Sequence, residues 1–147
     1  MATLSEVESI DQIVETFEFL DDWDSRYQYL IELGENLPSM PDALKTEENW
    51  VKPCMSTVHV AAQMDPGQSG LIYFQGDCDT AIIKGVLAVL IDLLSYRSLE
   101  EIRNMDVDSL FKRLHLEEHL TPSRHVGIYA IVDKMVERAA ALIDGQH

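Results

Sequence analysis

Apolar residues recur every three or four positions in the first third of the chain, which is the spacing of a helix with one buried face. The spacing runs through residues 10–20 and resumes over residues 23–31. Two consecutive helices are therefore predicted. Asp22 is suited to cap the start of the second helix, and Gly34 is expected to end it in the left-handed conformation that glycine tolerates.

The period changes to two over residues 56–64, where apolar and more polar side chains alternate. Such alternation is typical of a β-strand with one buried face. A turn-rich segment at residues 65–70 separates this strand from a second β-prone run at residues 71–75. The simplest prediction is an antiparallel hairpin, with a weaker third strand near residues 50–51.

The remainder of the chain has helical patterns. Residues 80–95 are apolar on nearly every side, which predicts a helix buried at the centre of the fold. Ser98 and Glu101 have the spacing of a capping box, which marks the start of a further helix. A short amphipathic segment follows at residues 107–114, and a Thr-Pro pair then predicts a long helix over residues 122–143, with Gly145 ending it.

The order of these elements, helices followed by a hairpin and further helices, indicates an α+β fold. In this fold a small antiparallel β-sheet packs against helices. The chain has 147 residues, of which 46% are hydrophobic. That size and composition predict a single domain over residues 1–147 with one hydrophobic core.

The net charge narrows the choice of partners. The chain carries 26 acidic and 11 basic side chains, a formal charge of −15. No basic cluster is larger than Lys112-Arg113, so nucleic acid and anionic membranes are disfavoured as partners. Residues 1–50 hold 13 acidic and 2 basic side chains. Solvated helix faces explain this excess of acidic side chains. The alternative is that the acidic side chains act together with Asp77 and Asp79 to attract a basic surface of a partner.

The start of the chain bears on its compartment. Residues 1–10 have neither the basic region nor the apolar core of a signal peptide. The longest apolar stretch, residues 85–94, is too short to span a membrane. A cytoplasmic protein is therefore predicted, and a structural disulfide between Cys54 and Cys78 is disfavoured in the reducing cytosol.

The two cysteines have different surroundings in the sequence. Cys54 lies in a predicted loop near Lys52, whose charge favours the reactive thiolate. A loop cysteine is a weak signal when taken alone, and a bystander is the alternative. Cys78 lies between Asp77 and Asp79, whose carboxylates oppose ionisation of its thiol, so a structural role is predicted for it.

Cysteine and histidine residues also raise the question of a metal site. In principle, the ligands of a metal ion could come from Cys54, His59, Cys78, His115 and His119. The last two are four residues apart, a spacing that would place both on one face of a helix. The sequence has no C-x-x-C and no H-E-x-x-H motif. Solvent-facing histidines at a helix end are therefore the preferred interpretation, and no metal site is predicted.

Four segments of the chain, in this order, resemble the SufE family of sulfur-acceptor proteins, which also includes CsdE. They are WDSRYQYLIELGENLP at residues 23–38, VKPCMSTVHV at 51–60, GDCDTAIIKGVLAVLIDLL at 76–94 and HLTPSRHVGIYAIV at 119–132. Because the resemblance runs through most of the chain, it is specific. It implies the SufE/IscU-like version of the α+β fold.

The resemblance also implies a function in sulfur relay. Cys54 would accept sulfur as a persulfide from a PLP-dependent cysteine desulfurase of the SufS or CsdA type, stimulate that enzyme, and deliver sulfur to an iron–sulfur scaffold of the SufBCD type. Transpersulfidation of this kind requires no cofactor and no metal on the carrier, which is not itself an enzyme. Asp79, Arg124 and His59 are expected to support the loop or bind the partner.

The alternative is a metal-binding or iron–sulfur scaffold protein of IscU-like fold, but such scaffolds use three cysteine ligands and this chain has two cysteines. The SufE family usually has serine at the position of Cys78 and tryptophan at that of His59. Cys78 is therefore either a small residue that takes the place of serine or a second functional thiol. His59 is either a half-exposed strand residue or a proton relay. Because a persulfide is readily reduced or oxidised, Cys54 is expected to be partly buried in the isolated protein.

Overall fold

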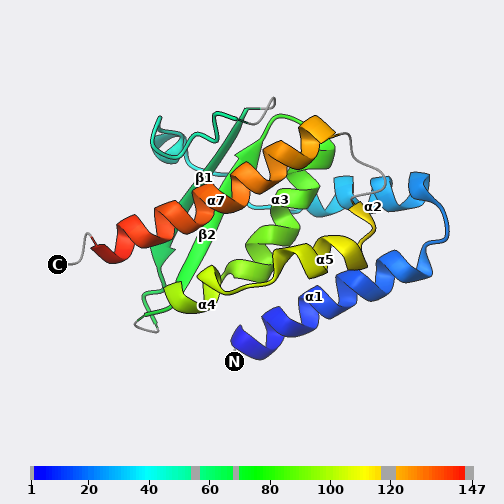
Figure 1. The fold of residues 1–147 in the computed structure, drawn as a ribbon, viewed down its shortest axis with the longest axis horizontal. Coiled ribbons are helices and arrows are strands. Elements are labelled where there is room, and N and C mark those ends of the chain that lie inside the picture. The colour runs from blue at the N-terminus through cyan, green and yellow to red at the C-terminus, as the bar shows by residue number, and fades with distance from the viewer. Residues whose placement is uncertain (1, 54–56, 68–69, 117–121, 145–147) are drawn as a thin grey trace.

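The computed structural model describes residues 2–53, 57–67, 70–116 and 122–144 (Figure 1). Two strands form one antiparallel sheet, and helices pack around it, which confirms the predicted α+β class. The elements, in chain order, are α1 (Ala2–Phe19), α2 (Trp23–Glu35), the 3₁₀ turn η1 (Asp42–Leu44), β1 (Val58–Met64), β2 (Ile72–Cys78), α3 (Ala81–Leu94), α4 (Leu99–Arg103), α5 (Val107–Arg113) and α7 (Pro122–Asp144).

The predicted hairpin is present, with a register that pairs Val58 with Cys78 at one end and Met64 with Ile72 at the other. Strand β2 begins one residue later than the predicted β-prone run and ends three residues later, because it continues through Gly76, Asp77 and Cys78. Glycine and aspartate are poor strand formers. The predicted third strand is reduced to an isolated bridge between Trp50 and His59.

Helix α3 lies at the centre of the fold, as predicted, with ten of its fourteen residues buried. It packs against α2, α1 and β2, while α7 packs along β1 (Figure 1). The sheet approaches α3 closely at Gly76, where a β-carbon would lie 3.0 Å from a methyl group of Leu87. That contact gives a reason for glycine inside β2.

The crossing of α2 and α3 corrects one prediction. Gly34 does not end α2 in a left-handed conformation; it lies inside the helix, whose C-cap is Asn36 with φ of −82°. Gly34 faces Gly85 of α3: a β-carbon on Gly34 would lie 2.9 Å from the Gly85 amide nitrogen, and one on Gly85 would lie 2.1 Å from the Leu30 carbonyl oxygen. The two glycines therefore allow the helix backbones to touch.

Two capping signals at helix starts, at Asp22 and at Ser98, are confirmed by the structure. The Asp22 side chain accepts a hydrogen bond from the Ser25 amide at 2.8 Å and caps α2. Ser98 and Glu101 form the predicted capping box at the start of α4. These short-range signals need only neighbouring residues, which explains why they are predictable.

The C-terminal region also follows the prediction, with one correction. Helix α7 (Pro122–Asp144) matches the long helix expected there, and the expected end residue, Gly145, lies outside the described part of the chain. Helix α5 ends before His115, which has a φ of +55°, so His115 does not lie on the helical face that was considered for it. His119 also lies outside the described residues.

Within the described residues, no helix is both long and apolar enough to cross a membrane.

The glycine crossing predicts a large effect of adding one methyl group. Gly85→Ala should lower the free energy of unfolding by about 3 kcal/mol, because the new β-carbon would clash with the Leu30 backbone and force α2 away from α3. This loss should exceed the gain of about 1 kcal/mol that alanine brings to a helix. Urea unfolding measures both effects together.

Gly67→Ala is the matched control, because a β-carbon there meets nothing closer than 3.7 Å. Its free energy of unfolding should stay within about 0.5 kcal/mol of the wild-type value. Equal stability of Gly85→Ala and Gly67→Ala would show that α2 and α3 do not depend on backbone contact.

Candidate functional site

The candidate acceptor Cys54 lies outside the described residues, whereas both ends of its loop are described. On the upstream side, Val51 is fully buried and its amide donates to the carbonyl of Val58 at 2.8 Å. The Val60 amide donates to the Asn49 carbonyl at 2.9 Å. These two hydrogen bonds tie the chain before the loop to β1, so the loop begins and ends at one place on the sheet.

Asp79 holds the downstream end of the same loop. Its carboxylate accepts a hydrogen bond from the Thr57 amide at 3.0 Å, and its own amide donates to the Thr57 carbonyl at 3.2 Å. The hydroxyl of Thr80 donates to the same carboxylate oxygen at 3.3 Å. Asp79 therefore fixes the backbone three residues after Cys54, while its role in supporting the loop or binding the partner stays a prediction.

Lys52, two residues before Cys54, is engaged elsewhere. Its ammonium group lies 2.9 Å from a carboxylate oxygen of Glu47 and 5.7 Å from the centre of the Trp50 ring. The hydrogen bond and charge of Lys52 lower the pKa of Glu47. The ammonium charge that was expected to favour a thiolate is thus shared with a carboxylate and an aromatic ring.

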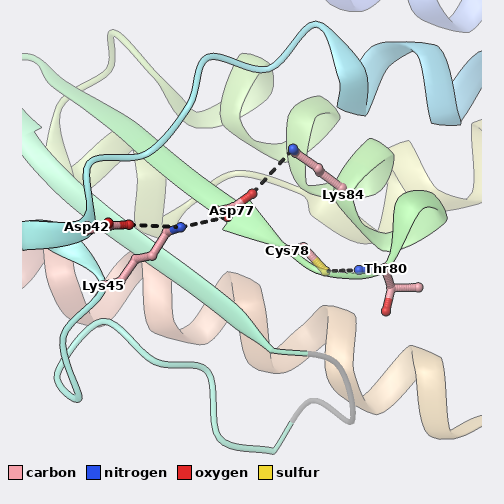
Figure 2. A network of polar contacts seen from close by, with 6 residues as sticks. All are labelled: Asp42, Lys45, Asp77, Cys78, Thr80 and Lys84. Carbon is pink, nitrogen blue, oxygen red and sulfur yellow. Dashed lines mark hydrogen bonds and ion pairs between the residues drawn. The ribbon is translucent and has the colours of Figure 1, made fainter.

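Figure 2 shows the polar network beside the end of β2. The two oxygens of Asp77 lie 3.1 Å from the Lys45 ammonium and 3.4 Å from the Lys84 ammonium, and Lys45 also reaches Asp42 at 3.5 Å. Burial acts to raise the pKa of Asp77, but hydrogen bonds from Lys45, the Cys78 amide and Lys84 outweigh it and lower this pKa. Asp77 is therefore a structural link between η1, β2 and α3 and a poor candidate for attracting a basic partner.

His59 lies opposite Asp77 in the sheet register and is half-buried. Burial is the main cause that lowers its pKa below the ordinary value of 6.5; the charge of Lys45 lowers it further, while the charge of Asp77 acts in the opposite direction. His59 is thus mostly neutral at physiological pH. The idea that it relays a proton for Cys54 stays a prediction, because Cys54 is not described.

Cys78 is the last residue of β2 and is 6% exposed within the hydrophobic core. Its sulfur lies 3.4 Å from the amide nitrogen of Thr80, which donates to it (Figure 2). This burial favours the structural role predicted from the flanking carboxylates.

The remaining predicted site residue, Arg124, lies in the first turn of α7, and its side chain is outside the described part of the structure. Among the described residues, no group of three histidine, cysteine or carboxylate side chains is placed to hold a metal ion. Sequence analysis missed three residues that contact residues 77–79, namely Thr57, Lys45 and Lys84. Their contacts with residues 77–79 come from elements distant in the chain, and no local pattern marks them.

Comparisons with known proteins show the family of the chain. The family model described as "SufE: Fe-S metabolism associated domain" matches residues 11–139. An uncharacterized SufE-like protein of Rhizobium meliloti (strain 1021) is 36% identical over 132 residues, which cover 89% of this chain and 94% of that protein. An uncharacterized SufE-like protein of Rhizobium etli is 36% identical over 133 residues, which cover 89% of each chain.

A solved structure supports the same fold. The solution structure of a hypothetical protein from Thermus thermophilus has a TM-score of 0.71 and 21% identity to this chain, covering 92% of it and 96% of that protein. The family match indicates an iron–sulfur-metabolism protein of the sulfur-transfer class, whose kind of partner is a cysteine desulfurase. The chain belongs to the SufE family.

The Asp79–Thr57 contacts predict a local effect on the loop. Asp79→Ala should increase the hydrogen-exchange rate of the Thr57 amide several-fold, because the loss of a hydrogen bond worth about 1 kcal/mol makes opening easier. Asp79→Asn retains an acceptor oxygen and should change this rate much less. If Thr57 exchanges equally fast in all three proteins, Asp79 does not hold the loop end.

The pKa of His59 gives a test of the network around Asp77. Lys45→Ala should raise this pKa by removing a repelling cation, and Asp77→Asn should lower it by removing an attracting anion. Imidazole chemical shifts during an NMR pH titration measure both changes. Below pH 6.5 the unfolded chain takes up a proton that folded His59 resists, so this group lowers the free energy of unfolding as the pH falls. Shifts with the opposite signs would contradict the described contacts.

Proposed function

We propose that the protein is a sulfur carrier that takes persulfide sulfur onto Cys54 from a cysteine desulfurase and stimulates that enzyme. Family membership supports the class of function. The residue assignment is supported by one observation: the chain has two cysteines, and Cys78 is almost completely buried in the core. A thiol that meets a partner's persulfide must be reached by that partner, and the position of Cys78 in the core disfavours it for this step.

The transfer is an exchange of one sulfur–sulfur bond for another. The Cys54 thiolate attacks the terminal sulfur of the desulfurase persulfide; the bond between that sulfur and the desulfurase cysteine breaks, and the desulfurase leaves as a thiolate. Cys54 then holds the persulfide, and no net oxidation or reduction occurs. The step requires access and a suitable thiolate rather than a general acid or a metal.

The described anchors support such a step. The buried Val51–Val58 hydrogen bond and the Asp79–Thr57 pair hold the described residues on the two sides of Cys54 at one place on the sheet. The persulfide would then be delivered to an iron–sulfur scaffold of the SufBCD type in the cytoplasm. The desulfurase would be of the SufS or CsdA type.

Cys54→Ser should abolish both sulfur acceptance and stimulation of a SufS-type desulfurase. After incubation with the desulfurase and cysteine, the wild-type protein should gain about 32 Da for each sulfur atom, and a reductant should remove this mass. Intact-mass spectrometry detects the gain, and alanine formation measures desulfurase turnover.

Cys78→Ser is the matched control, because serine retains an acceptor for the Thr80 amide. It should keep the mass gain and the stimulation. Full stimulation by Cys54→Ser would contradict the carrier assignment, and iron or zinc bound to the wild-type protein would favour the scaffold alternative.

A further inference from the structure

A second site candidate lies away from the Cys54 loop, between the start of β2 and the end of α3. A hollow of about 310 Å³ opens there, bordered by Leu37 and Pro38 from the segment after α2. None of its lining residues belongs to residues 51–58 or to the network around Asp77. Its volume is at the lower end of the range for small-ligand sites, about 300–1,000 Å³.

The chemistry of the lining selects a class of ligand. Asp92 of α3 supplies a half-buried carboxylate, while Tyr73 and Tyr96 supply aromatic rings whose planes are 19° apart with centres 6.3 Å apart. Phe74 and Ile91 add apolar surface. In the described part of the chain, no lysine or arginine lines the hollow. A carboxylate beside aromatic faces and apolar surface is suited to a planar organic cation.

The tyrosine pair is held in place by the fold. The Tyr73 hydroxyl bonds to the side-chain oxygen of Gln63 on β1. Tyr96 has a φ of +61°, which is unfavourable for a bulky residue. Its amide donates to the Ile72 carbonyl at 2.6 Å, and the Ile72 amide donates to the Arg97 carbonyl at 2.9 Å. The chain thus keeps a strained conformation that places the Tyr96 ring against Tyr73.

Ser95 secures the wall of the hollow from the helix side. It is 5% exposed, and its hydroxyl oxygen accepts a hydrogen bond from the Phe74 amide at 3.2 Å. This bond joins the end of α3 to β2 within the lining of the hollow. The carboxylate and the ring pair are therefore carried by elements that are fixed relative to each other, as a pre-formed binding site requires.

We propose that this hollow binds a guanidinium group carried on a short apolar stem. The Asp92 carboxylate would accept its N–H groups, and the tyrosine rings would contact its planar face. The formal charge of −15 raises the local concentration of cations around the protein. The guanidinium comes either from a free arginine-like molecule or from an arginine side chain of a bound polypeptide.

An NMR titration with two probes separates these sources. N-acetyl-arginine-N-methylamide represents a side chain within a polypeptide, and L-arginine represents the free amino acid. Either probe should cause saturable amide shifts confined to residues 37, 72–76 and 91–97. Tighter binding of the capped probe assigns a polypeptide source, and tighter binding of L-arginine assigns a small molecule. N-acetyl-citrulline-N-methylamide, which has the same shape without the charge, should bind at least about tenfold more weakly.

Variants test the residues of the site. Asp92→Asn should weaken binding of the tighter arginine probe about tenfold, and Tyr73→Leu should weaken it several-fold. Asp133→Asn, the same charge change on the exposed side of α7, should leave binding unchanged. Equal shifts with the arginine and citrulline probes, shifts spread over the acidic surface, or unchanged binding to Asp92→Asn would each overturn the proposal. None of these outcomes depends on sulfur transfer.

Discussion

Backbone contact between α2 and α3 is the constraint on which the remaining packing depends. Gly34 and Gly85 leave no space between the helices, so α3 lies against α2 and reaches the core with nearly all its side chains buried. The same helix meets the sheet at Gly76, where Leu87 occupies the place of a side chain. Close approach on both sides fixes the position of α3, and through it the position of β2 relative to the N-terminal helices.

This position sets the geometry of the proposed sulfur site. Because β2 ends at Cys78 and α3 begins at Ala81, Asp79 is held at the junction of two buried elements. From there it bonds Thr57, while buried Val51 bonds Val58 on the other side of the loop. The described residues on both sides of the proposed acceptor are therefore fixed to the core.

Local signals and amphipathic patterns predicted most of the elements, including α3, the hairpin and the capping box at Ser98. The errors arose where a distant contact decides the structure. The sequence around Gly34 resembles that of a helix end. Glycine is needed at this position because the backbone of Gly85 in α3 lies against it. Strand β2 continues through Gly76, which packs against Leu87, and Asp77, which pairs with Lys45 and Lys84. The sequence marked Asp79 and His59 as candidates, but their partners become visible only in the folded chain.

The central claim is that sulfur from a desulfurase resides on Cys54. Its most direct test is to trap the persulfide of the wild-type protein with an alkylating reagent, digest the protein, and locate the added sulfur by tandem mass spectrometry. The account predicts the extra sulfur on the peptide that contains Cys54 and none on the peptide that contains Cys78. Sulfur on the Cys78 peptide, or on neither peptide while the desulfurase is stimulated, would contradict the account.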